Sequence, residues 1–321
     1  MKPKIVVTGS YNVGLVMKTG KLPVWGETGL AEGFSEGPGG KGSNQAVAVA
    51  RLGGRSCFVG CVGRDRYGDQ ALEMLTAERV DIAAVKRTEL AKTGAGFVIL
   101  NRSGDNCILV DPGANRCMTP DDIDAIASVY EGAAFALFQL EMDKATVLHA
   151  MKTAAAKGAR VILNPAPALP DIEALLRHAT IVTPNESELK TISGIDASVS
   201  IEPQYIVELA QALLDHGPDA VVVTRGEDGA TIVRRHEVIH IRPPKVEPVD
   251  TTGAGDSFSA ALAVALGEGQ TLEEAARFAC FVGAYTVTGR EVIPALPTRE
   301  QVEAFIQAKA GEYQNGEGRQ R

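Results

Sequence analysis

The sequence predicts an α/β fold in which a mostly parallel central sheet lies between two layers of helices, with a small second sheet attached. Short runs rich in β-branched residues, such as "KIVVTGS", "RVILNPAP", "ATIVTPNE" and "DAVVVTRG", alternate with helical patterns such as "SNQAVAVARLGG" and "KATVLHAMKTAAAKGA". Strands that are apolar throughout and separated by helices are typical of a parallel sheet covered on both faces. Ligands of such sheets bind beyond the carboxyl ends of the strands, where the polar motifs below are found.

Two Gly-rich, extended stretches do not follow this alternation, residues 13–36 and 91–110. We interpret them as a small β-sheet lid on an α/β domain that comprises residues 1–12, 37–90 and 111–310. A lid of this kind would exclude water from the site beneath it.

Composition limits the possible functions of the chain. It has 321 residues, 45% of them apolar, and 40 acidic against 32 basic side chains without a basic run, so we expect no nucleic-acid partner. The first apolar run is too short for a signal peptide or a membrane span, and we expect a cytoplasmic protein with no membrane partner. Its five cysteines form no CxxC pair and are expected to be reduced and packed. The polar end, residues 311–321, is predicted to be a flexible tail.

The stretch "VDTTGAGDSF" (249–258) places small residues directly before a carboxylate. Gly253, Ala254 and Gly255 would leave free N–H groups at the start of an apolar helix, where the helix dipole adds partial positive charge. Asp256 at the edge of this anion hole is a candidate general base. A Gly-rich helix cap with an acid in its first turn is the alternative interpretation.

A second glycine turn, "GPGGKGSNQAVAVARLGG" (37–54), also precedes a helix. Its bare backbone, with Lys41 and Asn44, could bind a ligand with many hydroxyl groups. It is not a Walker A loop, because Gly42 stands where Ser or Thr is required, and no GxGxxG fingerprint begins the chain. Glycine turns before helices are common in α/β proteins, so this motif alone is ambiguous.

Three further motifs end predicted strands. "TPNESE" supplies Asn185, Glu186 and Glu188 as oxygen ligands suited to Mg2+, directly or through water, although a strand-to-helix turn explains it equally well. "TRGEDGA" offers Thr224 and Gly226 as phosphate contacts, with a simple hairpin turn as the alternative. "LFQLE" places Glu141 at the end of a buried run, where a carboxylate is more often functional than on a surface.

Taken together, these motifs resemble the two signatures of the ribokinase, or PfkB, family of carbohydrate kinases. The first is "GGKGSNQA" from Gly39, followed by Gly53 and Gly63, and the second is "DTTGAGDSFSAAL" from Asp250. "LNPAPA", "TPNESE" and "VTRGEDG" follow the family's order and spacing, so the resemblance covers nearly the whole chain. It implies the ribokinase-like three-layer α/β/α sandwich.

The resemblance also implies an ATP-dependent kinase that transfers the γ-phosphate to the hydroxymethyl group of a pentose-like sugar, with D-ribose the first candidate. Asp256 would be the base and Gly253, Ala254 and Gly255 the anion hole. The residues implied in sugar binding are Asn12, Gly14, Gly40, Lys41, Asn44, Glu141 and Asp256. Those implied in ATP binding are Asn185, Thr224, Gly226, Gly229, Gly255 and Cys280. Mg2+ would be organised by Asn185 and Glu188, and K+ by Asp250, Thr252, Thr286, Gly289, Glu291 and Ala295.

Two positions depart from the family pattern. Ribokinases carry Asn-x-Asp after the first strand, where the Asp grips two sugar hydroxyls, but this sequence has Gly14 there. Either the substrate lacks that hydroxyl pattern or another group replaces the acid. In "GREVIP" (289–294), Glu291 and Val292 replace small residues beside the implied K+ site, a departure that disfavours activation by K+.

Several functions remain in competition. A kinase for another sugar or a nucleoside shares the chemistry, and Gly14 favours it. A sugar-sensing protein without catalysis is disfavoured by the intact "GAGD" motif, and a nicotinamide dehydrogenase by the missing fingerprint. Apolar lid segments such as "GFVIL" and "GLVM" predict a homodimer formed through the lid.

Overall fold

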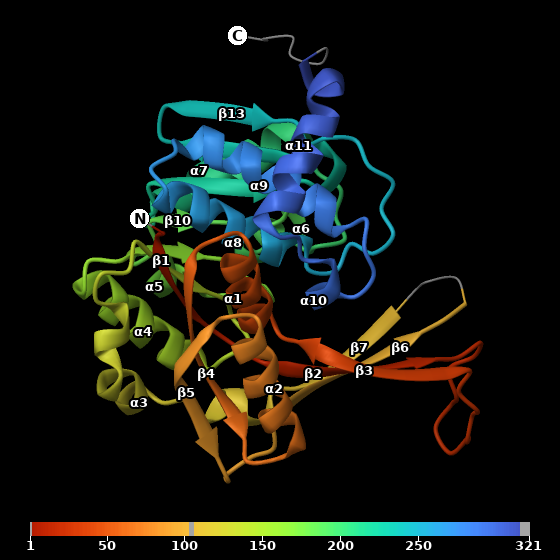
Figure 1. Cartoon of the computed structure of the whole chain (residues 1–321). Helices are drawn as coiled ribbons and strands as arrows, with labels where there is room; N and C mark the ends of the chain where they lie inside the picture. Colours follow the sequence, from red (N-terminus) through yellow and green to blue (C-terminus); the bar gives the residue numbers. More distant parts are fainter. Residues whose placement is uncertain (1, 103–105, 315–321) are drawn as a thin grey trace.

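The computed structural model describes residues 2–102 and 106–314, which form two β-sheets flanked by helices (Figure 1). The larger sheet has nine strands in the order β13-β12-β11-β10-β9-β8-β1-β4-β5. They are β1 (Lys4–Thr8), β4 (Arg55–Gly63), β5 (Asp81–Thr88), β8 (Phe135–Phe138), β9 (Arg160–Leu163), β10 (Ile181–Val182), β11 (Ala220–Thr224), β12 (Ala230–Arg234) and β13 (Glu237–Ile241). All pairs from β5 to β11 in this order are parallel and only the pairs β11–β12 and β12–β13 are antiparallel, which confirms the predicted, mostly parallel sheet.

The central strand β1 marks a switch point of the topology. It pairs with β4 on one side and with β8 on the other, and both pairs are parallel. Connections that leave a strand toward opposite sides open a crevice at its carboxyl end. The segments that follow β1 and β8, Gly9–Asn12 and Gln139–Glu141, therefore lie at this crevice.

Helices cover both faces of the large sheet because each strand sends alternate side chains to opposite cores. Ile5 and Val7 belong to one buried cluster and Val6 to the other. The first cluster packs under α1 (Lys41–Arg51), α2 (Arg66–Ala77), α8 (Ala254–Gly267), α9 (Leu272–Thr286), α10 (Val292–Ala295) and α11 (Arg299–Gln314). The second packs under α3 (Pro120–Ala125), α4 (Lys144–Ala156), α5 (Glu173–Leu176), α6 (Glu186–Ile192) and α7 (Pro203–Leu214). The predicted three-layer sandwich is therefore confirmed.

Three of the longer helices begin at a side chain that accepts a backbone hydrogen bond. Asp65 caps α2, Asp143 caps α4, and Thr271 forms a capping box with Glu274 at the start of α9. These caps satisfy N–H groups that the first turn leaves without partners. Helix α8 begins at Gly253 without a side-chain cap, as α1 and α7 also begin without one.

The second sheet has four strands in the order β3-β2-β6-β7 and extends away from the α/β body (Figure 1). Its strands are β2 (Asn12–Lys18), β3 (Gly33–Gly39), β6 (Gly94–Leu100) and β7 (Asn106–Asp111). One face carries Met17, Phe34, Phe97 and Leu109, all exposed and neighbours in the strand register. The sheet arises from the Gly-rich segments 13–36 and 91–110 that broke the helix and strand alternation, although residues 103–105 lie outside the described part.

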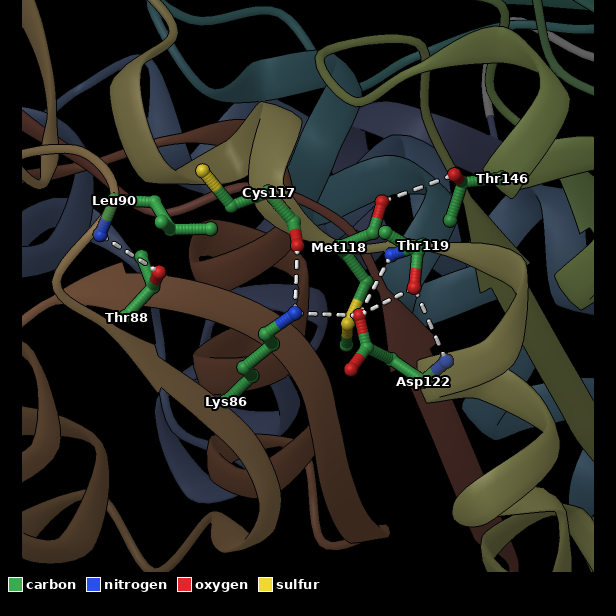
Figure 2. Close-up of polar contacts among 8 residues, drawn as sticks. All are labelled: Lys86, Thr88, Leu90, Cys117, Met118, Thr119, Asp122 and Thr146. Carbon is green, nitrogen blue, oxygen red and sulfur yellow. Dashed lines mark hydrogen bonds and ion pairs between the residues drawn. The ribbon is translucent and has the colours of Figure 1, made fainter.

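A polar cluster fastens the edge strand β5 to the helix layer (Figure 2). Lys86 Nζ donates to Cys117 O at 2.8 Å and to Asp122 Oδ2 at 2.6 Å. Asp122 also closes the capping box of α3 with Thr119. Lys86 thus joins the edge strand β5 to the start of α3. Its charge and that of Asp122 are paired with each other.

The end of the chain differs from the predicted tail. Helix α11 runs to Gln314, so residues 311–314 are helical, and residues 315–321 lie outside the described part. Within residues 2–102 and 106–314, no helix is long and apolar enough to cross a membrane.

Candidate active site

The start of α8 is shaped by two glycines with different constraints. Gly253 has φ 82°, and a Cβ atom placed on it would lie 2.4 Å from Val292 Cγ1. Both the left-handed backbone and the contact require glycine here. A Cβ atom on Gly255, in contrast, would meet nothing within 4 Å. The helix tip therefore opens onto free space beside Gly255.

The N–H groups of this tip are suited to an anion. Those of Gly255 and Asp256 lie in the first turn, where the helix offers them no acceptor, and the dipole adds positive charge. The Ala254 N–H is not free as expected, because it donates to Thr251 O at 3.4 Å. This long hydrogen bond is weak, and two amides beside open space remain directed to a ligand.

Asp256 is almost fully buried at this tip, and α1 holds its carboxylate. Asn44 Nδ2 donates to Asp256 Oδ2 at 2.9 Å, and Gln45 Nε2 donates to Asp256 Oδ1 at 3.2 Å. The Oδ1 atom of Asn44 is buried and has no partner within the described part of the chain. An unsatisfied buried acceptor next to a carboxylate is suited to a ligand that brings a hydroxyl group.

A second carboxylate, Glu141, lies at the switch-point crevice. Its Oε2 accepts from Lys41 N at 3.0 Å, from Asn12 Nδ2 at 3.4 Å and from the hydroxyl of Ser10. Glu141 therefore joins the ends of β1 and β8 to the start of α1. The structure brings Asn12, Lys41 and Glu141, all predicted sugar contacts, to one place.

The electrostatics show that the two carboxylates share a site with Lys41. The negative charge of Asp256, opposed by burial and aided by Glu141 and Glu188, raises the pKa of Lys41. Lys41 therefore stays protonated at neutral pH. A permanent cation beside the buried Asp256 and the half-buried Glu141 can attract the phosphate oxygens of an anionic ligand despite the negative net charge of the chain.

The glycines on either side of Lys41, at the start of α1, have a structural role that the sequence did not reveal. A Cβ atom on Gly40, which has φ 96°, would lie 2.6 Å from Asn12 N, and one on Gly42 would lie 2.6 Å from Gly9 C. Both glycines let the turn press against the β1–β2 connection. This packing places Lys41 and Asn44 at the crevice.

Gly14 lies in β2, in register with Gly37 of β3 and Gly96 of β6. A Cβ atom on Gly14 would make only an ordinary contact, 3.5 Å from Gly37 O. The backbone therefore leaves room for a side chain at position 14.

The predicted nucleotide residues lie at the ends of β10 and β11. Asn185 and Glu188 form the capping box of α6, and Asn185 bridges to Thr224. Gly226 and Gly229, with φ 54° and 82°, form the turn between β11 and β12. "TRGEDGA" therefore forms a hairpin turn, the alternative interpretation of this motif. The turn also places Thr224, the candidate phosphate contact, next to Asn185.

Burial raises the pKa of Glu188, although the hydrogen bond from Asn185 N–H and the charge of Lys41 act in the opposite direction. The charge effects among Glu188, Lys41 and Asp256 place Glu188 near the base. Among the described residues, no group of three His, Cys, Asp or Glu side chains could hold a metal ion. Asn185 and Glu188 fit Mg2+ only as partial ligands beside phosphate oxygens and water.

The residues predicted around K+ come from two adjacent segments. Val249 N donates to Val287 O at 2.7 Å, which joins the loop that contains Asp250 and Thr252 to the end of α9, where Thr286 lies. Asp250 Oδ1 accepts from Thr252 N at 2.9 Å. The remaining predicted positions, Gly289, Glu291 and Ala295, lie on the connection into α10 and on α10 itself.

Arg51 holds α10 and the residue that follows it in place. Its guanidinium pairs with Glu78, and its Nη1 donates to Ile293 O at 2.7 Å and to Leu296 O at 2.6 Å. Since Val292 of the same short helix contacts Gly253, Arg51 supports the wall of the anion hole.

Cys280 is buried in α9, and burial raises the pKa of its thiol to about 12. The thiol is therefore protonated and inert at neutral pH. Any contact of Cys280 with a nucleotide would be one of packing.

Several polar residues of the site were missed by sequence reasoning. Gln45 donates to Asn164 Oδ1 at 3.1 Å, accepts from Gln139 Nε2 at 2.6 Å and holds Asp256. Asn115 Nδ2 donates to Asn12 Oδ1 at 2.9 Å. Gln45, Gln139 and Asn164 stand inside motifs that the sequence analysis singled out, so buried amides at strand ends were the available signal.

Comparison with known proteins agrees with this geometry. A family model described as "pfkB family carbohydrate kinase" matches residues 2–299. The ribokinase of Bacillus subtilis is 38% identical over 303 residues, which cover 94% of this chain and 99% of that protein. The deoxyribokinase of Salmonella typhi is 33% identical over 303 residues, which cover 94% and 98%. The structure of Arabidopsis thaliana ribokinase complexed with ribose and ATP matches with a TM-score of 0.87 and 31% identity, over 96% of this chain and 99% of that one.

Proposed function

The chain belongs to the pfkB family of carbohydrate kinases, and on that premise we propose that it transfers the γ-phosphate of ATP to the hydroxymethyl group of D-ribose. It is a phosphotransferase with an alcohol acceptor, and its relatives are ribokinases and a deoxyribokinase. One observation carries the proposal for the site. A buried carboxylate, Asp256, lies beside free amides at a helix tip and next to the Lys41 and Glu141 cluster.

We assign the proton transfer to Asp256. Its two oxygens are held by Asn44 and Gln45, so the acid keeps one orientation while an acceptor hydroxyl approaches. As the bond between the hydroxyl oxygen and the γ-phosphorus forms, the bond from that phosphorus to the β–γ bridging oxygen breaks, ADP leaves, and the hydroxyl proton moves to the Asp256 carboxylate. The positioned base lets a neutral alcohol attack without a free alkoxide.

The amides of Gly255 and Asp256 would bind the transferring phosphoryl oxygens. They stabilise charge without reorganising, because the helix fixes them. Thr224, Gly226 and Gly229 would hold the remaining phosphates, with Asn185 and Glu188 toward a magnesium ion. Mg2+ supplies charge neutralisation on the phosphates. We propose that the segments of Asp250 and of Gly289–Ala295 hold K+ behind the helix tip.

Replacement Asp256→Asn tests the assignment. We expect kcat to fall by about two to four orders of magnitude while the KM values for ATP and for the sugar stay close to wild type, as for loss of a positioned base. An amide accepts from only one of Asn44 and Gln45, so the melting temperature is measured alongside. Asp124→Asn, which alters an exposed acid paired with His149, is the control. Near-normal turnover of the folded Asp256→Asn protein would refute the role.

The acceptor can also be another sugar or a nucleoside, and Gly14 is the observation that favours this alternative. The space above Gly14 accommodates an acceptor that carries other groups at this position, and a deoxyribokinase is among the relatives. An ADP-release assay with D-ribose, 2-deoxy-D-ribose and nucleosides separates the candidates. A several-fold preference in kcat/KM for an acceptor other than ribose would replace ribose in the proposal.

We further propose that the four-stranded sheet is a lid and that two lids pair in a homodimer. Met17, Phe34, Phe97 and Leu109 form an exposed apolar face on it, and such a face is unusual on a protein that remains monomeric. Light scattering after gel filtration is expected to give twice the chain mass, and Phe34→Glu with Leu109→Glu to give a monomer. A wild-type monomer at micromolar concentration would refute this proposal.

A further inference from the structure

The inner face of the four-stranded sheet is bare beside the site. Gly14 lies directly opposite Gly37 on one side and in register with Gly96 on the other. Residues directly opposite in neighbouring strands share a face, so three adjacent strands lack side chains at this level. Asn12, two residues before Gly14, projects to the same face and contacts Glu141. The glycine row thus adjoins the Asn12, Lys41 and Glu141 cluster.

Glu291 has an unusual backbone conformation next to this row. It has φ 61° and ψ 158°, a region that is populated almost only by glycine. Such conformations persist where the surrounding structure enforces them, and they cluster at functional sites. Arg51 holds the helix that begins directly after Glu291, because its guanidinium donates to the carbonyl groups of Ile293 and Leu296.

The Glu291 carboxylate is directed at the row. A Cβ atom placed on Gly37 would lie 4.0 Å from Glu291 Oε2. The neighbouring residue Val292 contacts Gly253, so Glu291 lies between the wall of the anion hole and the inner face of the sheet. No described residue hydrogen-bonds or ion-pairs with this carboxylate. Its oxygens are available to a ligand on the row.

We propose that Glu291 is a substrate-binding residue whose carboxylate accepts hydrogen bonds from acceptor hydroxyls above the Gly14–Gly37 pair. It would thereby replace the acid that β2 lacks at position 14. This inference rests on the proposed function. A carboxylate accepts only, and its two oxygens can bind neighbouring hydroxyls of a sugar ring. The ligand class is therefore a polyhydroxylated acceptor with hydroxyls remote from the hydroxymethyl group that receives the phosphate.

The competing explanation is that Glu291 is an exposed acid in a strained loop. Two substitutions separate these possibilities. Glu291→Gln keeps the shape but removes the charge, and Glu291→Gly removes the side chain and relieves the backbone. Arg79→Gly is the matched control, because Arg79 also has φ 61° but lies after α2, away from the site. Gly14→Asp combined with Glu291→Gly moves the carboxylate from the loop to β2.

The experiment measures kcat and the KM values for ATP and for D-ribose, or for the best acceptor of the panel, at saturating K+. Glu291→Gln and Glu291→Gly are expected to raise the acceptor KM roughly 10- to 100-fold, the range for a lost charge-assisted hydrogen bond. The KM for ATP stays within about twofold of wild type. The double variant regains at least part of the acceptor affinity, whereas Arg79→Gly leaves both KM values unchanged. Relief of the backbone is expected to raise the melting temperature of both glycine variants.

An unchanged acceptor KM in folded Glu291→Gln and Glu291→Gly overturns the inference. A shift in the K+ concentration needed for activity, without a shift in acceptor KM, also overturns it and assigns Glu291 to the cation loop. If the wild-type protein releases no ADP with any acceptor of the panel, the proposed function is overturned, and the inference with it. Failure of the inference alone is recognised by an active wild type with unaffected variants.

Discussion

Replacement of the two glycines beside Ala254 separates the requirements of folding from those of phosphate binding. Gly255 lies in α8 with open space around its Cβ position. Alanine in a helix is more favourable than glycine by roughly 0.5–1 kcal/mol, so Gly255→Ala is expected to raise the free energy of unfolding by about that amount. The same methyl group enters the space assigned to the phosphoryl group, and we expect kcat/KM for ATP to fall by about 100-fold.

Gly253→Ala is the matched comparison. Its left-handed backbone costs an L-residue about 1–2 kcal/mol, and the close contact with Val292 adds about 1–3 kcal/mol. It should lose both stability and activity. Urea unfolding and steady-state kinetics on both variants check the pair. A Gly255→Ala protein with wild-type kcat/KM would refute the idea that phosphate is bound at the tip of α8.

Two further predictions concern stability. Arg51→Gln removes the pair with Glu78 and two carbonyl contacts to the α10 segment, and urea unfolding should show a loss of about 1–3 kcal/mol, larger than for Glu78→Gln. Burial alone would raise the pKa of Asp65, but hydrogen bonds from Thr93 and Gly68 outweigh it and lower the pKa, so this acid stabilises the fold fully above its unfolded pKa of about 4 and loses that effect as pH falls through the lowered folded value. Unfolding midpoints at pH 5 and pH 3 should therefore differ less in Asp65→Asn than in wild type, and an equal difference would contradict this account.

The parallel sheet and its two helix layers could be predicted because their signal is local. Continuous apolar runs such as that of β11 and the glycine at the end of a helix follow from short-range rules, and those rules agree with the final fold. The edge strand β13 gave no such signal, because its exposed position lets polar residues alternate with apolar ones, whereas β12 beside it is buried. The helical residues 311–314 were taken for a tail because the sequence of this end is polar and carries no apolar periodicity.

The candidate site was predictable in its motifs but not in its contacts. "GAGD" and "GGKGSN" indicated Asp256 and Lys41, since small residues directly before a polar side chain leave backbone N–H groups uncovered beside it. Gln45, Gln139 and Asn164 are far apart in sequence, and only the closure of the sheet brings their amides together. The carboxylate of Glu291 faces Gly37 through a long-range contact that no spacing encodes.

The first turn of α1 has a consequence for selectivity. The Lys41 N–H at the start of this helix donates to Glu141 at the crevice, while Asn44 and Gln45, about one turn further along, hold the base. A sugar that fits poorly against the start of α1 would tilt this rigid turn and misalign Asp256, which accepts the proton. Discrimination among sugars should then appear in kcat as well as in KM. The same coupling should suppress hydrolysis of ATP by water when no sugar is bound.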